Sequence, residues 1–185
     1  MSNPDGQHIP LWAAIFLGIV GSSVLLILPV FIGTILQLDG IETDHAGWIG
    51  SADLVGYAVG SLTAFQLIKR FSWKKLAITG LTMMLAGNLA TIIAGESFAM
   101  ILLFRVALAG TGAGLVIAVP YTALATYREP ERATGTYWTF NVVGGSIALL
   151  LFPLIAEFAG PPGLFGALAL LAAAGIGVSL PTISD

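Results

Sequence analysis

The sequence contains no cysteine and very few charged residues, and both absences limit what the protein can be. Without cysteine, disulfide bonds and thiolate metal sites are excluded. Charged residues make up 9% of the chain, well below the quarter or so that is usual in soluble domains. Hydrophobic residues make up 57%, and the mean hydropathy is +0.94. This composition predicts an integral membrane protein.

Basic residues and histidines are also scarce. The 7 Lys and Arg residues are scattered and the net charge is -3, which argues against a nucleic-acid partner. No basic residue precedes the first apolar run, so no cleavable signal peptide is expected. His8 and His45 lie in a tail and a predicted loop, and no two carboxylates share a predicted span. The sequence therefore predicts no enzyme, metal or cofactor, and it has no G-x-x-x-x-G-K-[ST] motif for ATP.

Six apolar runs are long enough to cross a membrane as helices, which takes about 17 to 25 residues each. The runs lie at roughly 11–36, 48–68, 76–94, 98–124, 137–156 and 164–180. Short polar connections separate them. The sequence thus predicts an all-α membrane protein with six transmembrane helices, a tail at 1–10 and a short end at 181–185.

The basic residues predict the orientation of these spans, because Lys and Arg near span ends stay on the cytoplasmic side. Six of the seven lie in the second and fourth connections: Lys69, Arg70, Lys74, Lys75, Arg128 and Arg132. The first, third and fifth connections contain none. Both termini are therefore predicted to be cytoplasmic.

The two halves of the sequence share short motifs in the same order. GSSVLLILP (Gly21 to Pro29) matches GAGLVIAVP (Gly112 to Pro120), and DLVG at 53–56 matches NVVG at 141–144. Because each half has three spans, the second would enter the membrane from the opposite side, as in the inverted repeats of transporters.

Glycines and prolines at matching places predict bent helices that line a cavity. The candidates are Pro29, Pro120, Gly110, Gly112 and Gly114. Ordinary helix packing is an equal alternative, because Gly56 with Gly60, and Gly110 with Gly114, have the GxxxG spacing of closely packed helices.

Three stretches carry a resemblance to a known family: KRFSWKKL (69–76), RVALAGTGAG (105–114) and AGWIGSADLVGY (46–57). The first is similar to a D-R-x-G-R-K-x-L loop and the second to an Arg followed by spaced glycines, with the Arg one residue further away than usual. The third is similar to span 2 of many bacterial members of the same family. The chain resembles the N-terminal six-helix half of a major facilitator superfamily (MFS) transporter. The resemblance implies secondary active transport of a small solute by alternating access in a bacterial inner membrane. It also implies a gating loop with Arg70, Lys74 and Lys75, although Lys69 replaces the acidic residue and cannot accept a hydrogen bond.

Asp53 and Arg105 are the ionisable residues inside predicted spans. A charge in the membrane centre costs about 2.5 to 3.5 kcal/mol and usually has a partner or faces water. Counted from the starts of their spans, both lie at similar depth, so we expect them to pair or to face one cavity. Asp53 is the better candidate for proton coupling, because burial favours the protonated form of a carboxyl group. A fixed ion pair without a transport role is an equal alternative.

Other polar residues in the spans are candidate contacts for a polar solute: Ser22, Ser23, Tyr57, Tyr121 and Asn141. Each could instead bond between helices. Because twelve spans are normal in the family, a truncated or split transporter is expected, completed by a separate C-terminal half or, as the second choice, by a homodimer. A non-transporting membrane interaction or assembly protein, or an inactive remnant half, is the alternative function.

Overall fold

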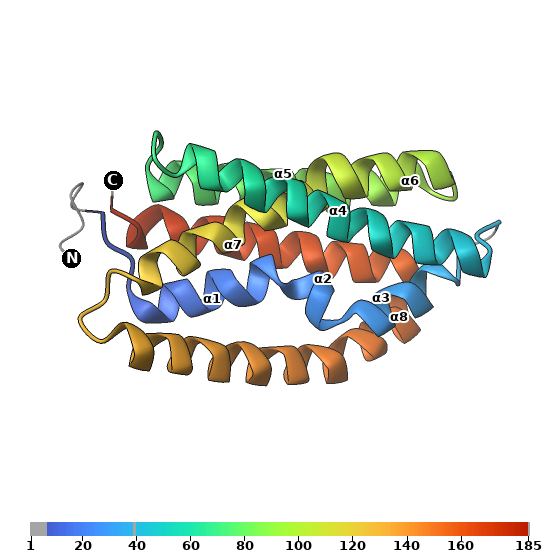
Figure 1. Cartoon of the computed structure of the whole chain (residues 1–185). Coiled ribbons are helices and arrows are strands. Elements are labelled where there is room, and N and C mark those ends of the chain that lie inside the picture. The colour runs from blue at the N-terminus through green and yellow to red at the C-terminus, as the bar shows by residue number, and fades with distance from the viewer. Residues whose placement is uncertain (1–6, 39, 185) are drawn as a thin grey trace.

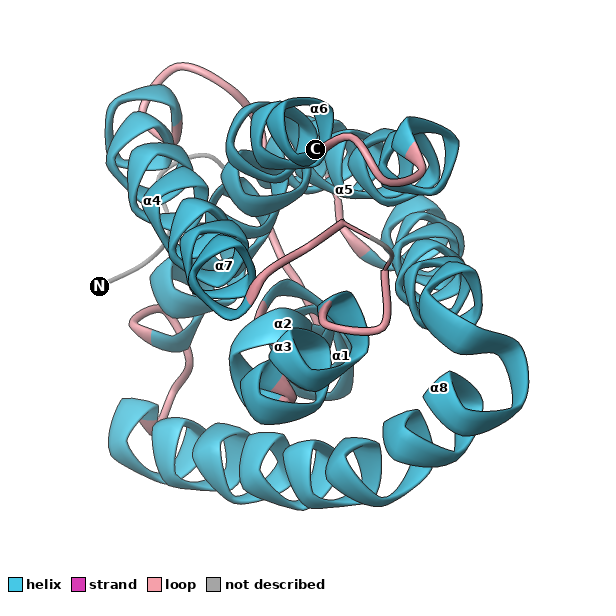
Figure 2. Ribbon diagram, turned by 90° about the vertical axis from the view of Figure 1, so that its right-hand side faces the viewer, coloured by secondary structure: helices cyan, strands magenta, loops and turns pink. Residues whose placement is uncertain are grey.

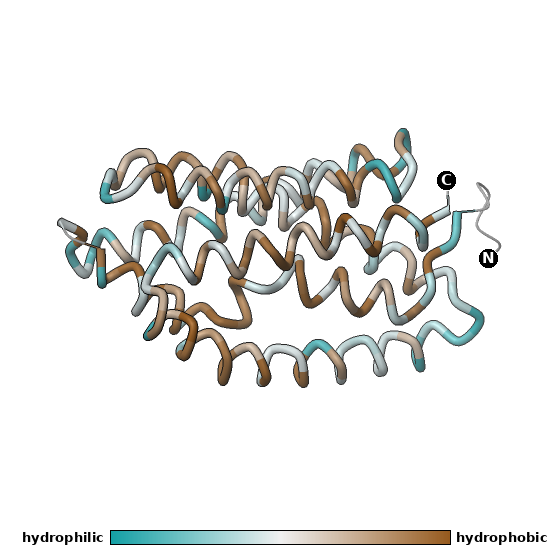
Figure 3. The backbone as a smooth tube through the Cα atoms, turned by 180° about the vertical axis from the view of Figure 1, so that it is seen from behind, coloured by the Kyte–Doolittle hydropathy of each residue, from teal (hydrophilic) through white to brown (hydrophobic). Residues whose placement is uncertain are grey.

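The computed structural model describes residues 7–38 and 40–184, which are helical throughout apart from short connections. Residues 1–6 of the predicted tail and residue 185 of the predicted end lie outside the described residues. The helices run side by side along one direction as a bundle (Figure 1). Hydrophobic residues cover most of their length and hydrophilic residues gather toward the two ends (Figure 3). This distribution fits the membrane class predicted from composition.

The first helical rod is broken into three pieces: α1 (Leu11–Gly21), α2 (Ser23–Leu26) and α3 (Leu28–Ile35). Ser22 and Ile27, which separate the pieces, have non-helical backbone angles. Pro29 lies in the first turn of α3, where a missing N–H costs little, whereas inside a continuous helix it would clash with the preceding turn. The break therefore accommodates Pro29, and the rod lies near the middle of the bundle in the end view (Figure 2).

Two longer helices follow, α4 (Thr43–Leu67) and α5 (Trp73–Ala94). The α4 helix starts before the predicted residue 48, with Asp44 in its first turn, where a carboxylate interacts favourably with the helix dipole. Ser72 caps α5 by accepting a hydrogen bond from the Lys75 amide. Gly95, with φ of 59°, ends that helix in a conformation that glycine adopts readily.

The next rod, 98–124, combines α6 (Phe98–Phe104), the π-helix η1 (Arg105–Gly110) and α7 (Thr111–Leu124). The last element, α8 (Pro130–Thr182), contains one non-helical residue, Gly160, with φ of 61° and ψ of -163°. Pro161 and Pro162 follow directly and start the second part of α8. The predicted connection at 157–163 is therefore reduced to a single kink residue, and α8 forms two rods.

Three helices of the described part are long and apolar enough to cross a membrane: Trp73–Ala94, Phe98–Leu124 and Pro130–Thr182. The α1–α3 rod does not qualify as one helix because of its breaks, and α4 is less apolar because it contains Asp53, several glycines and Gln66. The prediction of an all-helical chain is confirmed for the described residues, and three of its helices are long and apolar enough for the predicted membrane class.

One end of the bundle gathers the first and last described residues and the basic connections. Ser184 and His8 exchange hydrogen bonds, the Trp73 amide donates to Gln7 Oε1, and the Tyr127 hydroxyl donates to the Ile9 carbonyl. The segment before α1 therefore ties together the start of α5, the connection between α7 and α8, and the C-terminal end. Burial raises the pKa of Tyr127 to about 12.

Candidate functional site

Asp53 of α4 and Arg105 of η1 form an ion pair inside the bundle. Arg105 Nη2 lies 2.6 Å from Asp53 Oδ1. Asp53 is 4% exposed and Arg105 is 1% exposed. The structure thus brings together two charges that the sequence places on separate apolar helices, and their mutual neutralisation lowers the cost of burying them.

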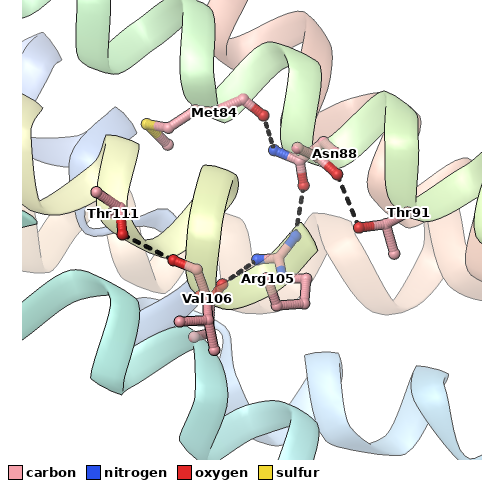
Figure 4. A network of polar contacts seen from close by, with 8 residues as sticks. Met84, Asn88, Thr91, Arg105, Val106 and Thr111 are labelled. Atoms are coloured by element: carbon pink, nitrogen blue, oxygen red, sulfur yellow. Dashed lines mark hydrogen bonds and ion pairs between the residues drawn. The ribbon is translucent and has the colours of Figure 1, made fainter. Parts of the chain in front are cut away.

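Asn88 of α5 is the second polar partner of Arg105, and the sequence analysis assigned it no role. Its Oδ1 accepts a hydrogen bond of 2.8 Å from Arg105 Nη1, and its Nδ2 donates to the Met84 carbonyl (Figure 4). The available signal was an amide inside an apolar span, which needs a partner in a low-dielectric surrounding. Arg105 therefore joins three helical segments through polar contacts.

Two aromatic rings complete the surroundings of the guanidinium group. Arg105 Cζ lies 4.9 Å from the centroid of the Phe31 ring and 5.8 Å from that of Phe165. Both distances are within the range of cation–π attraction. The two rings also contact each other edge to face, with centroids 6.0 Å apart. The α1–α3 rod and the second part of α8 thus stabilise the charge of Arg105 without a carboxylate.

A small cavity of about 10 Å³ lies against the ion pair. Its lining includes Asp53, Arg105, Asn88, Ser23 and Tyr57. This space is about enough for a single water molecule. It is too small for a solute, so a solute must bind elsewhere or meet the pair in another conformation.

A larger groove of about 280 Å³ lies between α4 and α7. It is lined by Tyr57, Ser61, Ala64, Phe65, Ile68, Ile117, Ala118, Tyr121 and Thr122. Ser61 and Thr122 donate their hydroxyls to helix carbonyls, and Tyr57 and Tyr121 contribute the other side-chain hydroxyls of the groove. None of the lining residues is charged. Tyr57 is the residue that lines both the groove and the small cavity beside the ion pair.

The other predicted solute contacts lie apart from these two spaces. Ser22 separates α1 from α2 and is half-buried. Asn141 is buried and donates Nδ2 to the Tyr137 carbonyl of its own helix. Neither residue is among those that line the cavity or the groove.

Tyr137 is a buried aromatic residue that the sequence did not single out. It has no solvent exposure, and its hydroxyl lies close to the side chains of Tyr121 and Asn141. Its ring contacts Tyr121 and Trp138 edge to face, at centroid distances of 5.8 and 5.7 Å. The ring of Tyr137 fills the space above Gly18 of α1, where any side chain would collide with it. An aromatic cluster thus joins the groove to the first part of α8.

The glycines predicted to bend the helices hold them together at backbone distance. A Cβ on Gly112 would lie 2.5 Å from the Gly80 carbonyl of α5, and Cβ atoms on Gly110 and Gly114 would collide with backbone atoms of α4. Gly56 and Gly60 approach the α6–α7 rod in the same way. These contacts are what the GxxxG spacing predicts. Pro120 lies inside α7, which continues through it.

The basic loop between α4 and α5 has no acidic partner in the described part of the chain, where the ion pairs are Asp53 with Arg105 and Glu129 with Arg132. Arg70 and Lys75 are exposed and Lys74 is half-buried. Lys69 Nζ lies 5.2 Å from the centroid of the Phe65 ring. The hydrogen bond from the Trp73 amide to Gln7 therefore anchors this loop, in place of a charge contact.

In the described residues, no cluster of three metal-ligating His, Cys, Asp or Glu side chains occurs.

The sequence is similar to a known protein family. The sequence model of the Major Facilitator Superfamily matches residues 11–183, which is nearly the whole chain. No curated protein matches the sequence.

Proposed function

We propose that this chain, which belongs to the Major Facilitator Superfamily, is a proton-coupled secondary transporter unit for a small solute. Membership of the family makes it a transporter of the major facilitator type. The finer proposal concerns which groups do the work: Asp53 carries the coupling proton, and the groove between α4 and α7 contributes to the solute site. The observation that supports it is the buried ion pair, together with Tyr57, which lines both the groove and the cavity beside the pair.

The physical argument concerns what protonation of Asp53 would change. While Asp53 is ionised, it holds Arg105 at 2.6 Å through charge attraction. A protonated Asp53 loses that attraction, whereas Arg105 keeps its hydrogen bond to Asn88 and its contacts with the two rings. Protonation therefore weakens the contact between α4 and η1 and leaves Arg105 attached to α5. This is the kind of two-state contact that couples a proton to helix movement.

The proposed membrane arrangement has six spans as two inverted three-helix repeats, with both chain ends and the basic connections on the cytoplasmic side of a bacterial inner membrane. It is supported by the clustering of those connections with His8 and Ser184 at one end of the bundle. The groove opens at the bundle surface, where Tyr121 is 42% exposed. A second six-helix unit would cover it, either a second copy of this chain or a separate C-terminal half.

A reconstitution experiment tests the proposal. The purified protein is placed in vesicles containing the pH indicator pyranine, and sugars, amino acids, carboxylates and aromatic amines are added in turn. We expect one solute class to drive a pH change with the wild-type protein and none with Asp53→Asn. An equal pH change with both proteins would contradict the coupling role of Asp53.

A second candidate function is a membrane interaction protein that does not transport. The tight packing around the ion pair favours it, because the adjacent cavity of about 10 Å³ is what a fixed structural pair would leave. This candidate predicts no solute-driven pH change in the same vesicles for any class.

A further inference from the structure

The π-helix η1 begins at Arg105, the basic member of the ion pair. In an α-helix each residue turns about 100°, so residues five apart point about 140° away from each other. Arg105 and Gly110 are five residues apart and are the first and last residues of η1. Both nevertheless contact Asp53: the guanidinium meets its carboxylate, and a Cβ on Gly110 would collide with its carbonyl oxygen.

The π-helix explains how both residues face α4. Its hydrogen bonds join residues five apart, which brings such residues onto the same side of the helix. The Thr111 hydroxyl also donates to the Val106 carbonyl, five residues earlier, at 2.7 Å (Figure 4). The turn thus contains one residue more than an α-helical turn needs.

The rod is packed very differently on the two sides of this turn. On the C-terminal side, Gly112 and Gly114 touch the backbones of α5 and α4. On the N-terminal side, Ile101 is the buried residue of α6. A change of register on the α6 side of the turn therefore disturbs far less packing than one on the α7 side.

We propose that the π turn is a positioning device that aims Arg105 at Asp53, and that its extra residue is the means of releasing the pair. If the turn moved one residue toward the N-terminus, it would pass Arg105 and rotate this residue by about 100° away from Asp53. The glycine contacts of α7 would stay in place. The role in transport rests on the coupling function proposed above, but the position of Arg105 does not.

Single-residue deletions test the positioning. Deleting Ala107 removes the extra residue and places Arg105 and Gly110 four apart, which is one face of an α-helix. The matched control is deletion of Ala58, an exposed alanine in the α-helical α4, which rotates one part of α4 against the other by about 100°. The readout is labelling of Asp53 by dicyclohexylcarbodiimide, which attacks protonated, unpaired carboxyl groups in membranes, measured by peptide mass. Arg105→Ala is the unpaired reference and Asp53→Asn the blank.

We expect the protein without Ala107 to be labelled within about twofold of the wild-type rate, and Arg105→Ala and the Ala58 deletion to be labelled several-fold faster. Labelling of the Ala107 deletion at the Arg105→Ala rate, or loss of its cooperative unfolding, would overturn the positioning role. Thr111→Val provides a test without deletion: losing the bond to Val106 should raise labelling, while Thr111→Ser should not. Wild-type labelling of Thr111→Val would contradict the part assigned to this hydroxyl.

Transport by the same deletion tests the release. In the pyranine vesicles, a protein without Ala107 that keeps Asp53 protected should lose the solute-driven pH change, because it has no residue to shift. A wild-type signal from this variant would overturn the release mechanism. Absence of any signal from the wild-type protein would overturn the proposed function instead, and the labelling result would still stand.

Discussion

Arg105 Nη2 and Asp53 Oδ1 lie 2.6 Å apart, and both side chains are almost completely buried. Removing one member leaves the other charge without its partner. We therefore expect Asp53→Ala and Arg105→Ala each to destabilise the protein by about 3 to 5 kcal/mol. The double variant should lose less than the sum of the two, because it leaves no unpaired charge. Unfolding of the purified proteins in detergent measures this, and additive losses would show that the two groups are not coupled.

Asn88 gives a second prediction, because it holds Arg105 from the opposite helix. Asn88→Leu leaves Arg105 Nη1 without its partner, in addition to Nε, which has none among the described residues, and should cost about 1 to 3 kcal/mol. The combination Asp53→Asn with Asn88→Asp moves the carboxylate from α4 to α5 and keeps Arg105 neutralised. This double variant should be more stable than Asn88→Leu. If coupling needs the carboxylate on α4, it should show no solute-driven pH change. Proton coupling in this swapped protein would mean that the position of the acid does not matter.

Tyr57 lines both the groove and the cavity beside Asp53, so its ring should keep water away from the ion pair. Tyr57→Ala is expected to raise the labelling of Asp53 by a water-soluble carbodiimide several-fold. Tyr57→Phe keeps the ring and should leave labelling unchanged. Tyr121→Ala, which removes a ring from the groove alone, is the matched control. Equal labelling of the alanine and phenylalanine variants at position 57 would show that the ring is no barrier.

The glycine contacts between α4 and the α6–α7 rod predict a position-specific response to alanine. A Cβ on Gly60 would collide with the Thr111 carbonyl, whereas a Cβ on Gly47 of the same helix meets nothing within 4 Å. Gly60→Ala should destabilise by about 1 to 3 kcal/mol because backbones must separate. Gly47→Ala should stabilise by up to about 1 kcal/mol through its better helix propensity. Thermal unfolding of the two variants checks this, and a similar change at both sites would contradict the packing argument.

Tyr127 predicts a pH dependence at the end of the bundle where His8 and Ser184 meet. Its hydroxyl donates to the Ile9 carbonyl at 2.7 Å, and burial raises its pKa from 10.0 to about 12. Because the folded protein holds this proton more tightly, the stabilisation is complete below pH 10 and is lost as the pH rises toward 12. Wild-type protein should therefore be more stable than Tyr127→Phe at pH 8, and the difference should shrink at pH 11. A constant difference across this range would exclude the hydroxyl proton as its source.

The sequence alone determined the chemical class of the protein and most of its helices. Long apolar runs leave the backbone no partner but itself in a membrane, so the helices at 73–94 and 98–124 follow from local composition. Asp53 and Arg105 could be singled out because a charge in such a run is costly wherever it ends up. The GxxxG spacings likewise marked the glycines that the structure places against neighbouring backbones.

Tertiary structure decided what those residues touch. Asp53, Asn88 and Arg105 belong to three separate helices, and no local pattern states which faces of those helices meet. The breaks at Ser22 and Ile27 and the π turn at 105–110 also depend on neighbours, because an isolated apolar run favours a regular helix. Burial of Tyr137 against Gly18 depends on the approach of α8 to α1. Periodicity and composition describe one helix at a time, whereas a site inside a bundle is defined by the contacts between helices.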